Sequence, residues 1–417
     1  MKRVVITGIG IVSPLGSGLD FVWDRLLQGK SGISNLPEQY NDYDSRVAGL
    51  VPRGTEKGEF DISKFMDSKE QRRNGLFISY AIGAASEAVQ DGKLDEIEDR
   101  TKIGVNISSG IGGLPEIGEV NTKLNARGIR SVNPFFIPSV LSNLAAGYVS
   151  MRFKANGPNY SLTSACASAS HSISNAAMLI RSGHADIMIS GGAEASICPI
   201  GVAGFSALTA LSTKFNDNPS KASRPFDKDR DGFVIAEGSA VLIMESLEHA
   251  LKRGAKIYGE YLDCGMTGDA SHVTKPEKEH CKRAMSIAIE RSGLKPEDIN
   301  YVNVHATSTP VGDESEMEAI KGIFGDHAKS KNFAVSATKS ATGHALGAAG
   351  ALESAFTLMA LKNQVLPPTI NVENAMDSIE GINFVPKSVA APLNYALCNS
   401  FGFGGTNISL IFKKYES

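Results

Sequence analysis

One cysteine of the sequence stands in a setting that suits a nucleophile. Cys166 follows a strand-like run at residues 159–163, and four alanine or serine residues come directly after it. The start of a helix offers free backbone N–H groups and partial positive charge, which stabilise a thiolate and lower its pKa. The same N–H groups can bind an oxyanion that forms beside the sulfur. Most free cysteines are buried and inert, but this small-residue turn leaves room for a long substrate, so we predict a catalytic thiol.

Two histidines and a lysine stand in comparable turns further along the chain. His305 ends a strand-like run and is followed by Thr307 and Thr309, whereas Lys339 and His344 lie where another such run enters a helix of small residues. Ligands of α/β proteins bind at such strand ends. The simple alternative for each histidine is a structural hydrogen bond. If two similar halves of the chain pack together, His344 is expected to point toward the reactive sulfur.

A lysine and a glutamate stand among apolar neighbours. Glu353 interrupts the apolar residues 345–362, and Lys339 precedes them in an equally apolar setting. A buried charge requires a partner of opposite sign, so we predict that Lys339 and Glu353 pair, the alternative being that both reach solvent. Because Glu353 lies within it, the apolar segment is interpreted as a buried helix and not as a membrane span.

A glycine-rich segment near the C-terminus surrounds one aromatic residue. Gly402, Gly404 and Gly405 flank Phe403. Glycines allow a backbone to approach a ligand closely, so an N–H group of this loop could be a second oxyanion donor. A turn between two strands is the alternative.

The elements that must position these residues alternate between strands and helices, and the pattern restarts after about residue 255. The chain has 417 residues, more than one core usually holds, so two fused halves are expected at residues 1–254 and 255–417. Residues 159–189 and 332–362 share the order strand, turn, small-residue helix, which predicts a duplicated α/β core with two buried central helices. Strand-like runs lie at 3–10, 102–110, 185–193, 238–246, 256–265, 301–309, 333–340 and 405–414, and helix-like runs at 77–92, 280–293 and 312–325.

Composition excludes several classes of function. The net charge of −3 gives no general attraction to nucleic acid or to an anionic membrane. Five cysteines without a CxxC pair indicate neither a zinc ribbon nor a disulfide framework, and a reducing cytoplasm is the expected location. The spacing of Cys264, His272, His280 and Cys281 matches no usual zinc site.

Taken together, the motifs resemble those of the β-ketoacyl-[acyl-carrier-protein] synthases of fatty acid synthesis, and most closely the elongating type II. The resemblance covers essentially the whole chain and rests on SACAS, HATSTPVGD, TKSATGHALGAAGALE, SRPFDKDRDGFVIAEG and NSFGFGGTN. It implies a thiolase-like αβαβα layered fold with two pseudo-symmetric halves, a homodimer, an acyl carrier protein as partner, and no cofactor or catalytic metal.

The resemblance also implies a role for each candidate residue. Cys166 would accept the acyl group, and His305 and His344 would hold the malonyl thioester carbonyl and stabilise the enolate formed by decarboxylation. The backbone N–H groups of Cys166 and Phe403 would form the oxyanion hole, and Phe403 would also act as a gate. The resemblance further implies that Lys339 with Glu353 orients the site, that Thr307 and Thr309 bind the phosphopantetheine arm, and that Ile111 and Phe205 line the acyl pocket. It also implies a monovalent-cation site at Asn303, Glu353, Asn399 and Ser400.

The chain departs from the family pattern at three places. Ala306 replaces a usual glycine, Ser164 replaces a common threonine, and Thr209 replaces a basic residue used for carrier docking. Two basic clusters remain as docking candidates or as solvated charge: Lys69, Arg72 and Arg73, and Lys123, Arg127 and Arg130 on one possible helix face.

Three other classes of protein share some of these features. A thiolase would need a second cysteine as base, and Cys398 stands in the wrong place for it. A non-catalytic chain-length factor would lack the nucleophile that Cys166 supplies. A polyketide or other specialised condensing enzyme would keep the same site, so the motifs do not distinguish it.

Overall fold

The computed structural model describes residues 2–274 and 276–416. A mixed sheet runs through the molecule in the order β11-β10-β14-β15-β9-β1-β8-β7-β5-β6, with β2 (Gly16–Ser17) added to β1. Its first half consists of β1 (Val4–Ser13), β5 (Ile103–Ser108), β6 (Asn159–Tyr160), β7 (Ile187–Glu194) and β8 (Gly238–Ser246). Its second half consists of β9 (Gly259–Gly268), β10 (Tyr301–Asn303), β11 (Ala334–Ser336), β14 (Tyr395–Gly402) and β15 (Thr406–Lys413).

The two halves of the sheet have the same topology. From the centre of the sheet outward, the strands of the first half follow the order β1-β8-β7-β5-β6, and those of the second half follow the order β9-β15-β14-β10-β11. If the five strands of each half are numbered in chain order, both halves read first, fifth, fourth, second, third. In both, the second strand is parallel to the third and fourth, and the fifth is antiparallel to the first and fourth. The predicted duplication is therefore confirmed. The exact boundary between the halves, at residues 254 and 255, stays a prediction. It falls in the segment that joins α9 (Leu247–Lys252) to β9.

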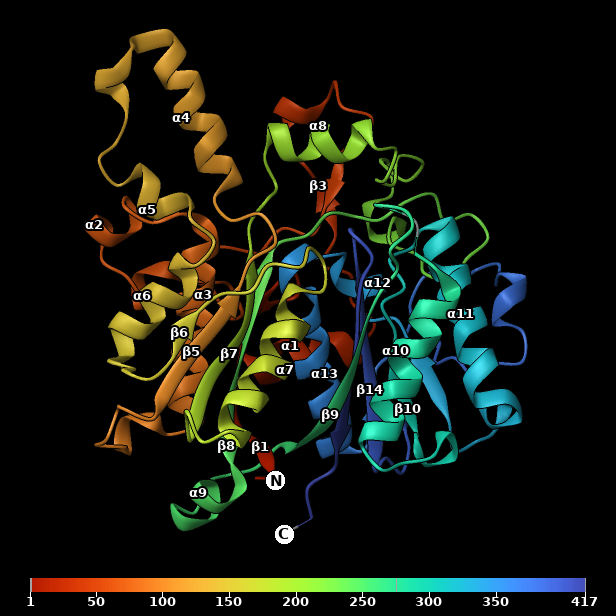
Figure 1. Cartoon of the computed structure of the whole chain (residues 1–417). Coiled ribbons are helices and arrows are strands. Elements are labelled where there is room, and N and C mark those ends of the chain that lie inside the picture. The colour runs from red at the N-terminus through yellow and green to blue at the C-terminus, as the bar shows by residue number, and fades with distance from the viewer. Residues whose placement is uncertain (1, 275, 417) are drawn as a thin grey trace.

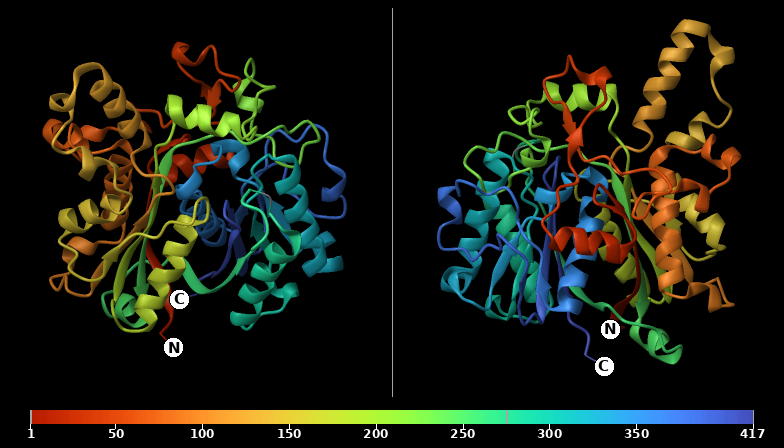
Figure 2. Two further views of the ribbon diagram at one scale, coloured as in Figure 1. Left: turned by 45° about the horizontal axis from the view of Figure 1, so that its top comes forward. Right: turned by 180° about the vertical axis from the view of Figure 1, so that it is seen from behind.

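Helices cover the outside of each half and fill the space between them. Helices α3 (Leu76–Asp91) and α6 (Leu144–Phe153) lie on one outer face, and α10 (Lys278–Arg291) and α11 (Pro310–Phe324) lie on the other (Figure 1). The central layer holds α7 (Ser168–Arg181) and α13 (Ala349–Asn363), each of which follows the third strand of its half. Both ends of the chain leave the molecule at the side opposite α4 (Leu114–Arg127) and α8 (Pro199–Ala207), as Figure 2 shows.

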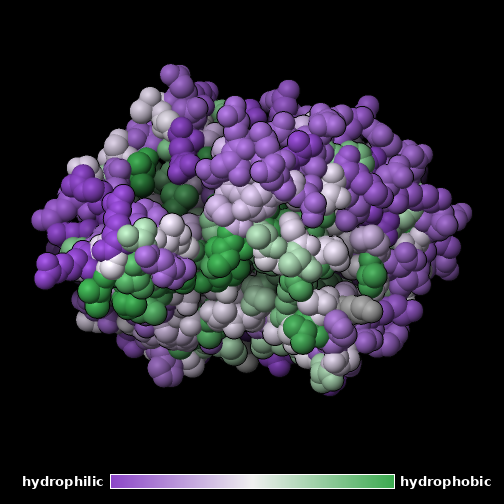
Figure 3. Space-filling view, turned by 90° about the horizontal axis from the view of Figure 1, so that it is seen from above, coloured by the Kyte–Doolittle hydropathy of each residue, from purple (hydrophilic) through white to green (hydrophobic). Residues whose placement is uncertain are grey.

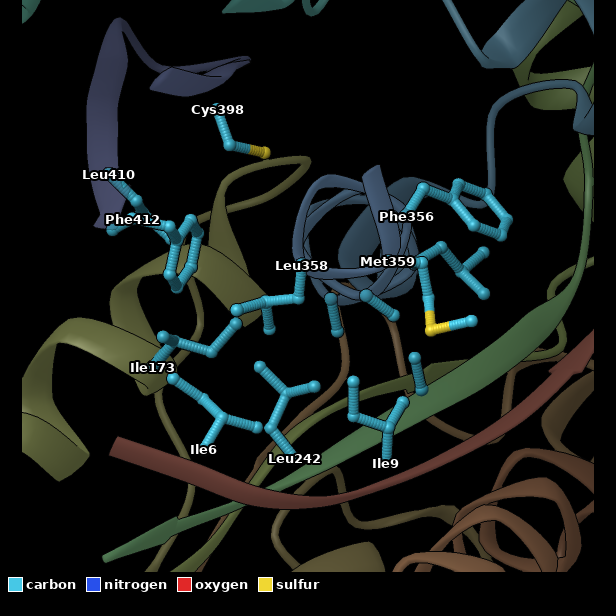
Figure 4. Packing of buried hydrophobic residues seen from close by; sticks show 14 of the residues in the cluster. Ile6, Ile9, Ile173, Leu242, Phe356, Leu358, Met359, Cys398, Leu410 and Phe412 are labelled. Carbon is cyan, nitrogen blue, oxygen red and sulfur yellow. The ribbon is translucent and has the colours of Figure 1, made fainter. Parts of the chain in front are cut away.

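The central helix α13 is buried along almost its whole length, as the sequence predicted. Its flanking side chains come from both halves: Ile9, Ile173 and Leu242 from the first half and Phe412 from the second gather beside Leu358 (Figure 4). Among the described residues, no helix is both long and apolar enough to cross a membrane.

Several strands and helices fall within a few residues of their predicted positions. The exceptions are β10 and β11, which are three residues long because the chain leaves the sheet at Asn303 and at Ser336. The residues that follow form the loops with the candidate histidines and lysine, so the early strand ends position the site. The sequence prediction also gave no separate strand for β14, in which the polar Asn399 and Ser400 interrupt the apolar residues.

The central helices approach each other so closely that one position admits no side chain. A Cβ atom at Gly350 of α13 would lie 2.1 Å from Ser170 Oγ of α7 and 2.9 Å from Ser400 Oγ of β14. Neither hydroxyl can move freely, because Ser170 and Ser400 are fully buried and share a hydrogen bond of 2.7 Å. The packing of the two halves therefore depends on a glycine at this position.

We predict that Gly350→Ala lowers the free energy of unfolding by about 1–3 kcal/mol through overpacking. Gly118→Ala is the control, since it also changes a helical glycine, but its Cβ would meet its nearest neighbour, Ile200, at an ordinary 3.6 Å. There the better helix propensity of alanine should raise stability by up to about 1 kcal/mol. Urea denaturation measures both changes, and equal stabilities for the two variants would contradict the close-packing argument.

Candidate active site

The nucleophile turn links β6 to α7 through a strained backbone. Cys166 lies two residues before the first helical residue, Ser168, and Ala165 adopts a left-handed φ of 49°. Two backbone hydrogen bonds of 3.1 Å fix the turn, from Ala167 to Ser164 and from Ser168 to Ala165. Such strain persists only where the surroundings enforce it. The predicted position of the sulfur at the start of a helix is thus confirmed.

Most of the predicted site residues line one cavity of about 330 Å³. Its walls include Cys166, His305, His344, Thr307, Thr309, Phe205 and Phe403. Lys339 and Glu353 lie behind this wall, buried to 2% exposure. Ile111 is not part of the cavity lining, and its side chain is 38% exposed because it projects from the loop after β5 toward the molecular surface.

The ring of His305 is held in a defined orientation by charged neighbours. Lys339 Nζ lies 3.4 Å from Nδ1 of His305. A lysine ammonium donates only, so Nδ1 accepts and the proton of the neutral ring is on Nε2. The backbone N–H groups of His305 and Ala306 donate to the Glu316 carboxylate at 2.9 and 2.8 Å. His305 can therefore present an N–H donor to the cavity.

His344 approaches the same space from the second half. Its backbone N–H donates to Val234 O at 2.8 Å, and its carbonyl accepts from Ala236 N at 3.0 Å. Its ring stands nearly perpendicular to that of His305, with centroids 5.3 Å apart. Burial, and next the charge of Lys339, lower the pKa of both imidazoles well below the usual value, so both rings are neutral at pH 7.

The predicted pair of Lys339 and Glu353 is confirmed. Lys339 Nζ donates to Glu353 Oε1, and both side chains are nearly fully buried. Burial raises the pKa of Glu353 to about 7, although the ammonium beside it acts in the opposite direction. The positive charge of Lys339 therefore lies close to the histidines and the cysteine, although Lys339 itself does not line the cavity.

The prediction that the helix start lowers the pKa of Cys166 is wrong. Burial raises the pKa of the thiol to about 11. The backbone N–H of Phe403 and the charge of Lys339 lower it, but their combined effect is smaller than that of desolvation. A sulfur buried to 8% exposure has lost the water that would stabilise its anion.

The glycine-rich segment is both a turn between strands and a wall of the site. It joins β14 to β15, with Gly404 and Gly405 at left-handed φ values of 84° and 70°. Gly404 N donates to Val273 O at 2.7 Å, and Asp269 N donates to Gly405 O at 3.0 Å. The hairpin therefore packs against residues 269–273, and its Phe403 N–H lies beside the Cys166 sulfur.

Two residues that contribute to the site had no clear signal in the sequence. Glu316 looks like a solvent-facing residue of an acidic helix, yet it is fully buried and holds the backbone of His305. Cys281 lines the cavity, and burial raises the pKa of its thiol far above the usual value. By contrast, Cys398 is buried in β14 and does not line the cavity, which agrees with its exclusion as a second catalytic thiol.

No metal site is formed by the residues the structure describes, since no three His, Cys, Asp or Glu side chains cluster suitably. Side chains of the predicted monovalent-cation site are already engaged in hydrogen bonds. Asn399 uses its amide on Glu316 and Ser409, and Ser400 bonds to Ser170. Within the described chain, Glu353 Oε2 is one acceptor without a partner, which does not make a coordination site.

The fold and the Cys-His-His cavity define a condensing enzyme of the thiolase type, and the comparisons agree. The chain matches the family "Beta-ketoacyl synthase, N-terminal domain" over residues 1–250 and "Beta-ketoacyl synthase, C-terminal domain" over residues 258–373. It is 47% identical to 3-oxoacyl-[acyl-carrier-protein] synthase 2 of Rhizobium meliloti, covering 100% of this chain and 99% of that one. It is 46% identical to the mitochondrial 3-oxoacyl-[acyl-carrier-protein] synthase of Arabidopsis thaliana, covering 99% and 93% of the two chains.

A solved structure extends the comparison to a complex. The chain superposes with a TM-score of 0.88 and 30% identity on a type II polyketide ketosynthase in complex with its acyl-carrier protein, with full coverage of both chains. The chain therefore belongs to the beta-ketoacyl synthase family. Its activity is the 3-oxoacyl-[acyl-carrier-protein] synthase II condensation, which elongates acyl chains in fatty acid biosynthesis.

We predict that alkylation of Cys166 by iodoacetamide in the resting enzyme accelerates about tenfold per pH unit between pH 7 and 9.5. The thiolate reacts, and its fraction rises tenfold per unit while the pH stays below the pKa of about 11. Peptide mass spectrometry at Cys166 measures the rate at each pH. A plateau that begins below pH 8 would contradict the raised pKa and support the lowered pKa that the sequence suggested.

Proposed function

We propose that Cys166 carries the growing acyl group in this condensation. Its thiol attacks the thioester of the acyl carrier, forms a new thioester and releases the carrier thiol. The backbone N–H groups of Cys166 and Phe403 would stabilise the oxyanion of the tetrahedral intermediate. The observation that carries this assignment is the convergence of Cys166, His305 and His344 on one cavity.

The two histidines act in the second half-reaction. Malonyl-carrier loses CO2, and the electron pair of the broken bond forms an enolate whose oxygen accepts hydrogen bonds from neutral imidazoles. The enolate carbon then attacks the carbonyl carbon of the Cys166 thioester, the C–S bond breaks, and the departing Cys166 thiolate takes up a proton from solvent. The lowered pKa values of His305 and His344 support this role, because each neutral imidazole can donate an N–H hydrogen bond to the enolate oxygen.

A substrate arm can enter past the two threonines. Thr307 and Thr309 line the cavity, and their hydroxyl oxygens lie 3.1 Å apart. Ser308 between them has a left-handed φ of 70° and donates its N–H to Asp313 at 3.1 Å. We assign the phosphopantetheine arm to this pair of hydroxyls, and the gating role to Phe403 at the same wall.

We predict that variants separate the two half-reactions. Cys166→Ala should abolish acyl transfer, whereas His305→Ala and His344→Ala should lower malonyl decarboxylation by about 10²–10³-fold, as lost oxyanion donors do elsewhere. Mass measurement of the acyl adduct and release of labelled CO2 follow the two steps independently. Unchanged decarboxylation in both histidine variants would refute the assignment.

A homodimer is the second part of the proposal. Strand β6 ends the sheet and is only two residues long, so its outer edge is open to another strand. The side chains of Ile111, Ile137 and Leu141 are 38%, 57% and 46% exposed. Seen from above, apolar side chains gather along one side of the molecule and hydrophilic ones cover the other (Figure 3). A partner chain at this edge would cover Ile111 and complete the acyl pocket that the resemblance implies.

Carrier docking is proposed for the basic residues near α4, with one correction. Helix α4 ends at Arg127 because Gly128 turns the chain with a φ of 72°, so Arg130 lies in a separate 3-10 turn and the three basic residues do not share a helix face. Lys123 pairs with Glu119, and Arg73 stacks on the ring of Phe135 at 4.2 Å. Arg127 and Arg130, with Lys69 and Arg72 of the other cluster, are therefore proposed for contact with an acidic carrier. A cytoplasmic location also remains a proposal, since two relatives are named mitochondrial.

We predict that Arg127→Glu and Arg130→Glu each raise KM for acyl-carrier substrates about three- to tenfold with little change in kcat, and that the effect diminishes at high salt. Lys252→Glu in α9 is the matched control, because α9 lies at the opposite end of the molecule (Figure 1). Steady-state kinetics at two salt concentrations provide the measurement. A similar loss in the control variant would show that net charge, and not a docking site, is responsible.

A further inference from the structure

A buried carboxylate beside the site has no role in the mechanism above. Glu194 ends β7 and is fully buried. It accepts hydrogen bonds from Gly110 N at 2.8 Å, Gly347 N at 3.1 Å, Ser109 Oγ at 3.1 Å and Ser196 Oγ at 2.9 Å. Four donors converge on a single side chain, and none of them is a lysine or an arginine.

This carboxylate connects loops from the two halves of the molecule. Gly110 belongs to the loop after β5, and Gly347 belongs to the 3-10 helix η8 (Leu346–Ala348) that enters α13. A Cβ atom at Gly347 would lie 2.2 Å from Gly110 N and 2.7 Å from Glu194 Oε2. The two loops therefore touch at the carboxylate, with no space for a side chain between them.

Each bonded glycine is next to an apolar residue. Leu346 precedes Gly347 and lines the cavity. Ile111 follows Gly110 and lies on the exposed edge that the proposed partner chain would cover. Leu346 has a left-handed φ of 47°, which is costly for a branched side chain. The hydrogen bond from Gly347 N to Glu194 holds the backbone directly after this strained residue.

We propose that Glu194 is a positioning residue that holds Leu346 and Ile111 in place and thereby sets which acyl chain lengths the enzyme accepts. The inference rests on the proposed role of Cys166 as acyl acceptor. Burial raises the pKa of the Glu194 carboxyl itself. In its ionised form, Glu194 also adds to the raised pKa of the Cys166 thiol, although burial of the sulfur is the larger cause. Lys339 and the Phe403 N–H act in the opposite direction, and His305 and His344 are neutral.

Two substitutions separate the positioning effect from the charge effect. Glu194→Asp keeps the charge but shortens the side chain by one methylene, so it cannot reach Gly110 and Gly347 together. Glu194→Gln keeps the length: its oxygen can accept from the two backbone N–H groups, and its NH2 group can donate to the two serine hydroxyls, which turn to accept. Glu237→Asp is the control, because Glu237 is also a buried carboxylate, bonded to Tyr80 and Val51 N.

The experiment incubates each full-length variant with acyl carriers of graded length and measures the Cys166 adducts by mass. We expect Glu194→Asp to change the ratio of long-chain to short-chain adduct by about threefold or more, since one methylene of pocket space is worth at least that much. Glu194→Gln should keep the adduct ratio of the wild type. Iodoacetamide should alkylate Cys166 of this variant about three- to tenfold faster at pH 8, because the pKa of the thiol falls. Glu237→Asp should change neither readout.

The inference is overturned if folded Glu194→Asp retains the wild-type ratio, or if Glu237→Asp alters the ratio equally. If Glu194→Asp does not fold, Ser109→Ala decides, because it removes one donor to Glu194 and the acceptor of Gly112 N at 2.9 Å, and an unchanged ratio there also overturns the inference. A wild-type enzyme that forms no adduct at Cys166 would refute the proposed function itself, which distinguishes the two failures.

Discussion

The site depends on one buried positive charge, which lies between a carboxylate and a neutral imidazole. The ammonium of Lys339 has Glu353 on one side and Nδ1 of His305 on the other. Its field lowers the pKa of both histidines and opposes the effect of burial on the Cys166 thiol. A buried cation without a partner would be very costly, so the apolar helix α13 must contain a glutamate at this one position. The pair thereby fixes the protonation states that the proposed roles of the histidines in carbonyl binding and decarboxylation require.

The duplicated fold explains how these groups meet. In each half, the chain passes from the third strand through a turn into a central helix, and the two turns carry Cys166 on one side and Lys339 with His344 on the other. Because Gly350 allows the helices to touch at Ser170, the two turns open into the same cavity. The β14–β15 hairpin closes the third side with Phe403. Residues that are far apart in the sequence thus converge through topology and not through a local motif.

The sequence allowed prediction of the elements and of most site residues, because periodicity marks buried strands and because Cys166, His305 and His344 stand in recognisable turns. Three features were beyond its reach. The raised pKa of Cys166 follows from burial by surrounding elements, which the local helix start does not reveal. The role of Glu316 requires knowledge of which face of α11 is covered. The exposure of Ile111 depends on how the loop after β5 projects, which neither spacing nor composition encodes.

The central claim is that Lys339 keeps His305 as a neutral ring with its proton on Nε2. Nitrogen-15 NMR of histidine-labelled protein at pH 7, with His305→Gln used to assign the signal, tests it directly. We expect His305 to be protonated at Nε2 and unprotonated at Nδ1, and we expect this protonation state to persist down to pH values well below 6.5. An imidazolium signal at pH 7, or a proton on Nδ1, would contradict it.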